Sequence, residues 1–183
     1  MTGHEKIVQR LIAARVNTEV IDADGRTPLI WAVISQNMSA VSQLLQAGAD
    51  VNHADLKGIT PLIYSFDQDN PDVTQLLIDA GADINVTLKG SRLDTLMLAA
   101  KQGNSAIIRA LISKGMDVNA KSRAGITPLM MAIASNQKDA AKTIIDSGAR
   151  INDKDSVERS AIFYSSHKNI TADIAKMLID KGA

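Results

Sequence analysis

The 183-residue sequence contains no cysteine, which excludes disulfide bonds, thiolate zinc sites, iron–sulfur clusters and cysteine nucleophiles. Aromatic residues make up only 3%, and Lys+Arg equals Asp+Glu at 20 each. A chain of formal net charge zero has no overall electrostatic attraction to nucleic acid or to anionic membranes. Apolar residues still account for 45% of the chain, which is enough to build a hydrophobic core.

Long apolar runs are also missing, since no stretch reaches the ~18 residues that a bilayer-spanning helix needs. The opening residues, from Met1 to Ile7, lack the basic-then-apolar pattern of a secretory signal peptide. We therefore expect a cytoplasmic protein. A periplasmic or secreted protein that had lost its signal peptide would have the same sequence, so those locations stay open.

An internal repeat dominates what is present. The strings Thr27-Pro28-Leu29, Thr60-Pro61-Leu62 and Thr127-Pro128-Leu129 recur, and Asp94-Thr95-Leu96 and Ser160-Ala161-Ile162 fill the gaps in the series. Two further series keep the same period of 33 or so residues. One consists of glycines, Gly48, Gly81, Gly115, Gly148 and Gly182; the other of asparagines, Asn37, Asn70, Asn104, Asn136 and Asn169.

Each unit is predicted to be a helix–turn–helix followed by a turn-rich connector. In residues 22–54, Thr27 can cap a first helix and Pro28 suits its first position. Asp94 and Ser160 are good caps in the same slot. Asn37 is predicted to begin the second helix, and Gly48 supplies the left-handed residue that ends it. Such a unit is too short to close a core alone, so neighbouring units must stack.

This pattern resembles the ankyrin repeat, with its T-P-L-H-x-A and G-A-D-V-N strings. The resemblance implies an all-α solenoid in which β-turn or hairpin connectors join helix–turn–helix units into a single domain, 1–183. It divides the chain into an N-terminal half-repeat, full repeats and a C-terminal capping repeat: 3–21; 22–54, 55–87, 88–121, 122–154; 155–183. It also implies a non-catalytic protein-interaction module with no cofactor.

The sequence departs from the family at two recurring positions. The histidine after Thr-Pro-Leu is replaced by apolar residues that we expect to form one packed column: Ile30, Ile63, Met97, Met130 and Phe163. The glycine of the connector, present as Gly25, Gly58 and Gly125, is replaced by Arg92 and Glu158. These two substitutions put the connector geometry of their repeats in question.

Candidate catalytic and metal-binding residues are sparse. The histidines His4, His53 and His167 lie in different units without ligand spacing, so we expect them to be solvent-exposed and predict no metal site. Asp22, Asp55 and Asp155 recur at one phase of the repeat, which favours hydrogen bonding within turns over acid–base chemistry. Trp31 and Tyr64 share another phase; stacked packing is the preferred interpretation, and a contact with a partner stays open.

The non-repeating residues at the connectors and on the first helices are the predicted partner site, because the resemblance implies a concave groove there. Ile59, Leu93 and Ile126 would form an exposed aliphatic stripe, with an excess of basic residues around it. Leu56 and Val157 also map to the connector tips. The predicted partner-binding residues are Arg26, Ile34, Lys57, Ile59, Arg92, Leu93, Lys101, Arg123, Ile126 and Arg159.

The predicted partner is a protein with an acidic and partly apolar segment. We expect a monomer that binds neither nucleic acid nor membranes. Two alternatives stay open: the chain could be the recognition part of a larger enzyme or effector, or the basic tips could simply be solvated.

Overall fold

The computed structural model describes residues 17–67, 70–88, 90, 92–165 and 172–183. The chain divides into two compact units, Met1–Ile84 and Asn85–Ala183. Throughout the described residues the regular structure is α-helical, apart from two isolated β-bridges that join Thr87 to Asp94 and Lys154 to Ser160. The predicted all-α repeat fold is therefore confirmed. The expected N-terminal half-repeat, 3–21, lies mostly outside the described residues.

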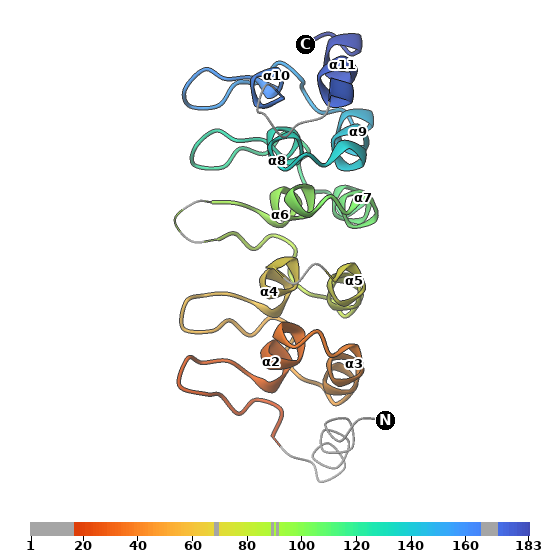
Figure 1. The fold of residues 1–183 in the computed structure, drawn as a ribbon. Coiled ribbons are helices and arrows are strands. Elements are labelled where there is room, and N and C mark those ends of the chain that lie inside the picture. Colours follow the sequence, from red (N-terminus) through yellow and green to blue (C-terminus); the bar gives the residue numbers. More distant parts are fainter. Residues whose placement is uncertain (1–16, 68–69, 89, 91, 166–171) are drawn as a thin grey trace. The chain divides into compact units, whose positions relative to one another are not determined.

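The described part of the first unit contains two helical pairs, and each pair consists of a first helix that contacts the connectors and a second helix behind it (Figure 1). Helix α2 packs against α4, and α3 packs against α5. Leu29, Val33 and Leu62 of the first helices and Val41 and Leu77 of the second helices are buried at this junction. The four helices are α2 (Pro28–Ile34), α3 (Met38–Gln46), α4 (Pro61–Asp67) and α5 (Pro71–Asp79).

The described part of the second unit repeats this arrangement with three helical pairs (Figure 1). The first helices α6, α8 and α10 pack in series, and so do the second helices α7, α9 and α11. Ile108, Ile133 and Ile144 are fully buried between them. The helices are α6 (Thr95–Gln102), α7 (Ser105–Ser113), α8 (Pro128–Ala134), α9 (Lys138–Asp146), α10 (Ala161–Tyr164) and α11 (Ala172–Asp180).

The predicted helix caps are mostly present. The Thr27 hydroxyl accepts a hydrogen bond from the Ile30 N–H, and the Asp94 carboxylate accepts one from the Met97 N–H at 2.8 Å. Ser160, predicted to cap in the same slot, makes no side-chain cap bond to the short helix α10. That expectation was wrong, so α10 begins without this support.

One residue of the asparagine series does not cap a second helix. Asn136 precedes the cap position and has a φ of 57°, like Gln36 at 54° in the first full repeat. Gln137 takes the cap position of α9 but makes no cap bond, and its amide donates instead to the Lys101 carbonyl at 3.3 Å. Asparagine tolerates the left-handed conformation better than most residues. The prediction that Asn136 begins a helix was therefore off by one residue; Asn169 lies outside the described residues.

Within each unit, two neighbouring connectors are joined through their backbones. The Leu56 N–H donates to the Asp24 carbonyl, and the Ser156 N–H donates to the Ala124 carbonyl, each at 3.0 Å. Because the backbones approach so closely, a Cβ on Gly125 would lie 2.8 Å from the Ser156 nitrogen.

The left-handed position of the connector survives the loss of glycine. Arg92 and Glu158 have φ angles of 54° and 66°, close to the 72° of Gly125. The connectors of these two repeats therefore keep the turn, although a residue with a Cβ is strained in this conformation.

The apolar column predicted at the missing histidine is buried at four of its five positions. Ile30, Ile63, Met97 and Met130 are each at most 3% exposed. Phe163 is 44% exposed, so its assignment to the packed column was wrong. It lies on α10, which has only four residues.

Gly125→Ala is expected to destabilise the protein more than Gly148→Ala. Both glycines have a positive φ, 72° and 95°, so alanine carries a backbone penalty of about 1–2 kcal/mol at each. Only Gly125 has backbone atoms in the way, since nothing lies within 4 Å of a Cβ on Gly148. Urea unfolding of both variants measures the difference. Equal losses would mean that the connectors do not pack as closely as described.

Restoring the family's histidine by Ile63→His should destabilise the protein. Ile63 is 3% exposed on α4, and burial of an imidazole without a hydrogen-bond partner costs about 1–3 kcal/mol. Thermal unfolding checks this expectation, with Ile63→Val as the control for lost volume. A higher melting temperature for the histidine variant would show that the slot offers polar partners.

Candidate binding surface at the connectors

In each connector, one residue closes the turn and occupies an equivalent position of its repeat. Its carbonyl accepts a hydrogen bond from the residue that opens the turn, as in Asp55 N–H to Ile59 O at 3.0 Å and Asp155 N–H to Arg159 O at 3.0 Å. The closing residues are Arg26, Ile59, Leu93, Ile126 and Arg159. The backbone thus fixes five of the ten predicted partner-binding residues at equivalent points of their repeats.

An aspartate that opens a connector is bound to a ring nine residues later. The Asp55 carboxylate accepts from the Tyr64 hydroxyl at 2.7 Å, and the Asp22 carboxylate accepts from the Trp31 indole N–H at 2.8 Å. Asp55 also accepts the N–H groups of Lys57 and Ile59, each at 2.9 Å. The predicted role of these aspartates in turns is therefore confirmed, and each also ties the connector to the first helix.

The same bond occurs in the last repeat, where the Tyr164 hydroxyl donates to the Asp155 carboxylate at 2.6 Å. The two intervening repeats have neither the aspartate nor the ring. Their connectors open with Leu88 and Ser122, and Leu98 and Met131 stand at the ring position. The nine-residue spacing between an aspartate and a ring donor is thus a signal present in the sequence. The prediction of stacked packing for Trp31 and Tyr64 overlooked it.

Protonation in these pairs follows from the hydrogen bonds. Burial and the bond to Asp155 raise the pKa of Tyr164 to about 12. Burial opposes ionisation of Asp155, but the bonds from the Tyr164 hydroxyl, the Arg159 and Val157 N–H groups and the Arg159 side chain together lower its pKa well below the usual range. The carboxylate is therefore charged and the phenol neutral at physiological pH.

Two of the predicted binding arginines are held within the protein. The Arg26 guanidinium lies 5.2 Å from the Trp31 ring centroid and 6.0 Å from that of Tyr64, and it pairs with Asp24 at 3.2 Å. Cation–π contacts of this kind restrain an arginine side chain. Arg26 therefore bridges the first helices of neighbouring repeats, with only a minor part of its side chain exposed.

Arg159 makes the equivalent contacts in the last repeat. Its guanidinium lies 5.4 Å from the Phe163 ring and 5.2 Å from the Tyr164 ring, and its Nε is 2.8 Å from the Asp155 carboxylate. A partner would have to compete with these contacts for the charge of either arginine.

Four other predicted bases differ from these two. They are exposed and form no ion pair with any residue that the structure describes; they are Lys57, Arg92, Lys101 and Arg123. Lys57 belongs to the first unit and the other three to the second. Their ammonium and guanidinium groups are available to an acidic ligand.

The predicted exposed aliphatic stripe is not exposed as expected. Ile59, Leu93 and Ile126 are half-buried where they close their turns, and Ile34 is half-buried at the end of α2. Ile59 also belongs to the first unit, and Leu93 and Ile126 to the second.

The exposed apolar side chains of this region are different residues. Leu56 is 76% exposed and Val157 61% exposed at connector tips, whereas Trp31 and Phe163 are each 44% exposed on first helices. Leu56 and Val157 belonged to the wider predicted groove but not to the ten binding residues. Their position at turn tips was the available signal, because turns rarely need an exposed aliphatic residue.

His53 contradicts the expectation of exposed histidines. It is half-buried, and its Nε2 lies 2.8 Å from the Gly25 carbonyl, which links two neighbouring connectors. His4 and His167 lie outside the described residues. Within the described part of the chain, no cluster of three His or acidic side chains could hold a metal ion. No described helix is long and apolar enough to cross a bilayer.

Replacing Tyr164 by Phe should lower stability at pH 7 by about 1–3 kcal/mol, because a hydrogen bond to a charged acceptor is lost. The pKa of Asp155 is lowered in the folded state, so its contribution is present above about pH 4 and is lost as the pH falls. Tyr164→Phe should make this acid loss shallower. At high pH the wild type should lose further stability between about pH 10 and 12, as the phenol ionises in the unfolded state first.

Urea unfolding followed by circular dichroism between pH 2 and 12 measures these dependences. Tyr164→Leu serves as a second variant, because it also removes the ring from beside Arg159. An acid limb in Tyr164→Phe that matches the wild type would contradict the assigned hydrogen bond.

Comparison with known proteins agrees with this geometry. The chain is 27% identical over 150 residues to the potassium channel AKT2/3 of Arabidopsis thaliana; the match covers 82% of this chain but only 18% of the channel. A family model for ankyrin repeats in three copies matches residues 1–88 and 88–155. The helical pairs, the glycine-ended second helices and the connectors of both units fit that family, so the chain belongs to the ankyrin repeat proteins.

Proposed function

We propose that this chain is a non-catalytic module that binds a partner protein through the connectors and first helices of its repeats. Repeats of this family generally mediate contacts between proteins. The proposed partner-binding residues are those predicted from the sequence, in two sets: Arg26, Ile34, Lys57 and Ile59 in the first unit, and Arg92, Leu93, Lys101, Arg123, Ile126 and Arg159 in the second.

One observation carries the proposal: the bases at the connectors differ in whether the fold already uses them. Arg26 and Arg159 are committed to carboxylates and rings, whereas Lys57, Arg92 and Arg123 are exposed and unpaired among the described residues. A basic side chain that forms no ion pair with a described residue is available for recognition. Bases of this kind chiefly set the association rate and the choice of partner.

The proposed ligand is a protein segment that is acidic and partly apolar. The unpaired bases support the acidic part. The exposed side chains of Trp31, Leu56, Val157 and Phe163 support the apolar part, because buried apolar and aromatic residues supply most of the affinity of an interface. We propose a monomer that acts in the cytoplasm and takes a protein partner in preference to nucleic acid or a membrane.

A second candidate is that the chain serves as the recognition part of a larger enzyme or effector. The channel that it resembles favours this candidate, because the matched segment makes up only 18% of that protein. The two candidates share the same binding surface and differ in what the surface is attached to.

Charge reversal at the unpaired bases should slow association with the partner. Arg92→Glu with Arg123→Glu tests the second unit, and Lys57→Glu tests the first. We expect about a tenfold lower association rate for the double variant, with a weaker dependence on salt. The partner is first captured from lysate by site-specific crosslinking at position 123, and surface plasmon resonance then measures the rates.

The matched control is Arg109→Glu with Lys114→Glu, which makes the same change in net charge on and after α7. Leu56→Ser and Val157→Ser test the apolar contribution and should raise the dissociation rate without altering the melting temperature, because both side chains are largely exposed. An equal loss of association rate in the control would reduce the effect to net charge and remove the connectors as the site.

A further inference from the structure

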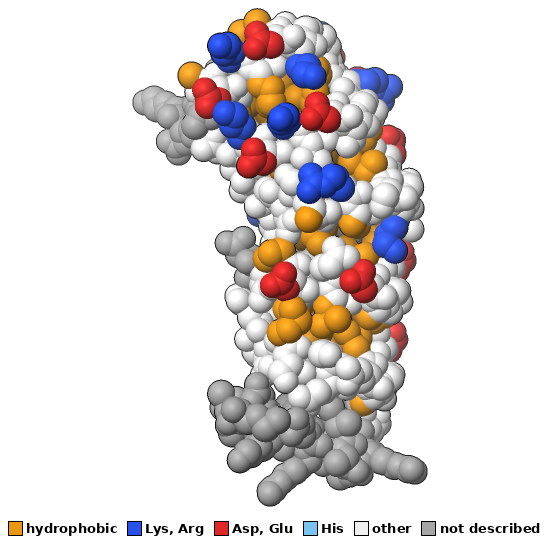
Figure 2. Space-filling view, turned by 90° about the vertical axis from the view of Figure 1, so that its right-hand side faces the viewer, with side chains coloured by type: hydrophobic (Ala, Val, Ile, Leu, Met, Phe, Trp, Pro, Cys, Tyr) orange, Lys and Arg blue, Asp and Glu red, His pale blue; other side chains and the backbone are white. Residues whose placement is uncertain are grey.

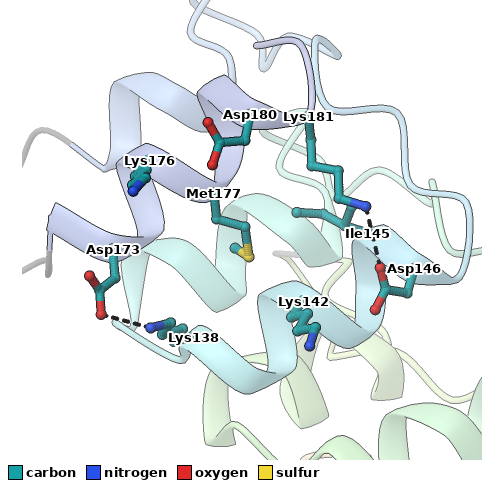
Figure 3. Close-up of a pocket in the computed structure, with 9 residues that line it drawn as sticks. All are labelled: Lys138, Lys142, Ile145, Asp146, Asp173, Lys176, Met177, Asp180 and Lys181. Carbon is teal, nitrogen blue, oxygen red and sulfur yellow. Dashed lines mark hydrogen bonds and ion pairs between the residues drawn. The ribbon is translucent and has the colours of Figure 1, made fainter.

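A cavity of about 370 Å³ lies between the second helices α9 and α11 of the last two repeats, on the face away from the connectors. Figure 2 shows basic and acidic side chains gathered around an apolar patch at this end of the second unit. The lining residues, labelled in Figure 3, are Lys138, Lys142, Ile145, Asp146, Asp173, Lys176, Met177, Asp180 and Lys181.

Two ion pairs bracket this cavity. Lys138 of α9 lies 2.7 Å from Asp173 of α11, and Lys181, just after α11, lies 3.7 Å from Asp146 of α9 (Figure 3). These pairs join the two helices at the two ends of the cavity. They neutralise two of the four lysines that line it.

Lys142 of α9 and Lys176 of α11 form no ion pair with a described residue. Their side chains come from the two helices that form opposite walls of the cavity (Figure 3). Asp180, one helical turn after Lys176, is the one lining carboxylate outside the two ion pairs among the described residues. The cavity therefore offers two ammonium groups outside these ion pairs against one such carboxylate, and the charge of Lys176 also helps to lower the pKa of Asp173.

The floor of the cavity is apolar. Met177 points from α11 toward α9, and Ile145, which is 9% exposed, lies on α9. Methionine is a flexible, polarisable side chain that adapts to different apolar ligands. A ligand of matching chemistry has anionic groups at the rim and an apolar group at the centre.

We propose that this cavity binds an acidic peptide segment whose central residue is apolar. The lysines would pair with two carboxylates of the peptide, and the apolar side chain would lie on Met177 and Ile145. A peptide fits better than a small phosphate compound for two reasons. The two lysines stand on different helices, so separate carboxylates of one peptide can reach them. Met177 and Ile145 carry no hydrogen-bond donor, so they suit an apolar side chain and not a phosphate oxygen. Binding would also cross-link α9 to α11 and so stabilise the last repeat.

The site lies on second helices, so it is independent of the proposed connector surface. The probe is the peptide acetyl-Glu-Glu-Leu-Glu-Glu-amide, titrated into the ¹⁵N-labelled full chain. We expect amide shifts in α9 and α11, together with slower hydrogen exchange in α11, and these should persist in the variant Arg92→Glu with Arg123→Glu, which removes any binding of the peptide at the connectors. Lys142→Gln with Lys176→Gln should weaken binding about tenfold. Asp180→Asn should strengthen it, because it removes the opposing carboxylate.

Three comparisons can overturn the proposal. Arg109→Gln with Lys114→Gln removes two bases from α7 and its end, and it should leave binding unchanged; an equal loss would mean attraction by net charge alone. The peptide acetyl-Glu-Glu-Gly-Glu-Glu-amide should bind more weakly, and equal affinity would remove the apolar floor from the site. Inorganic phosphate that binds more tightly than the peptide would make this a small-anion site.

Discussion

Each described helical pair is too small to bury its apolar face alone, and the packing of neighbouring pairs within each unit is the constraint on which the rest depends. Ile30 and Ile63 of the first unit, and Met97 and Met130 of the second, stand where the family has a histidine and are buried between helices. An apolar side chain there removes the hydrogen bonds that a histidine would make. The repeats therefore depend more on shape and burial than on polar contacts at this position.

Polar contacts instead lie at the connectors, where one pair of neighbouring repeats in each unit meets backbone to backbone. The carbonyl of Gly25 accepts from His53 Nε2 when that nitrogen carries the proton, and Asp24 accepts from the Leu56 N–H. In the first unit Arg26 joins two repeats by lying between the rings of Trp31 and Tyr64. The connectors are thus rigid at the base, which lets their exposed tips carry residues that folding does not constrain.

Local signals made much of the fold predictable. Threonine–proline pairs begin the first helices α2, α4 and α8, and glycines end the second helices, because capping and left-handed geometry depend on a few adjacent atoms. Prediction failed at α9, where the asparagine series pointed to Asn136 but the left-handed turn at that residue leaves Gln137 at the cap position. Solvent exposure was harder to predict. Ile59 was expected to be exposed and is half-buried, whereas Phe163 was expected to be packed and is 44% exposed.

The sequence by itself determined the repeat, its period, its helical class and the family, because each rests on residues a few positions apart. Only the tertiary structure decided which charges remain available. Arg26 and Arg123 have the same charge and both lie in connector turns, yet one is held by rings and a carboxylate and the other is exposed. Likewise, the cavity between α9 and α11 forms because residues about 34 positions apart in the sequence face each other. Patterns of a few adjacent residues do not predict such a contact.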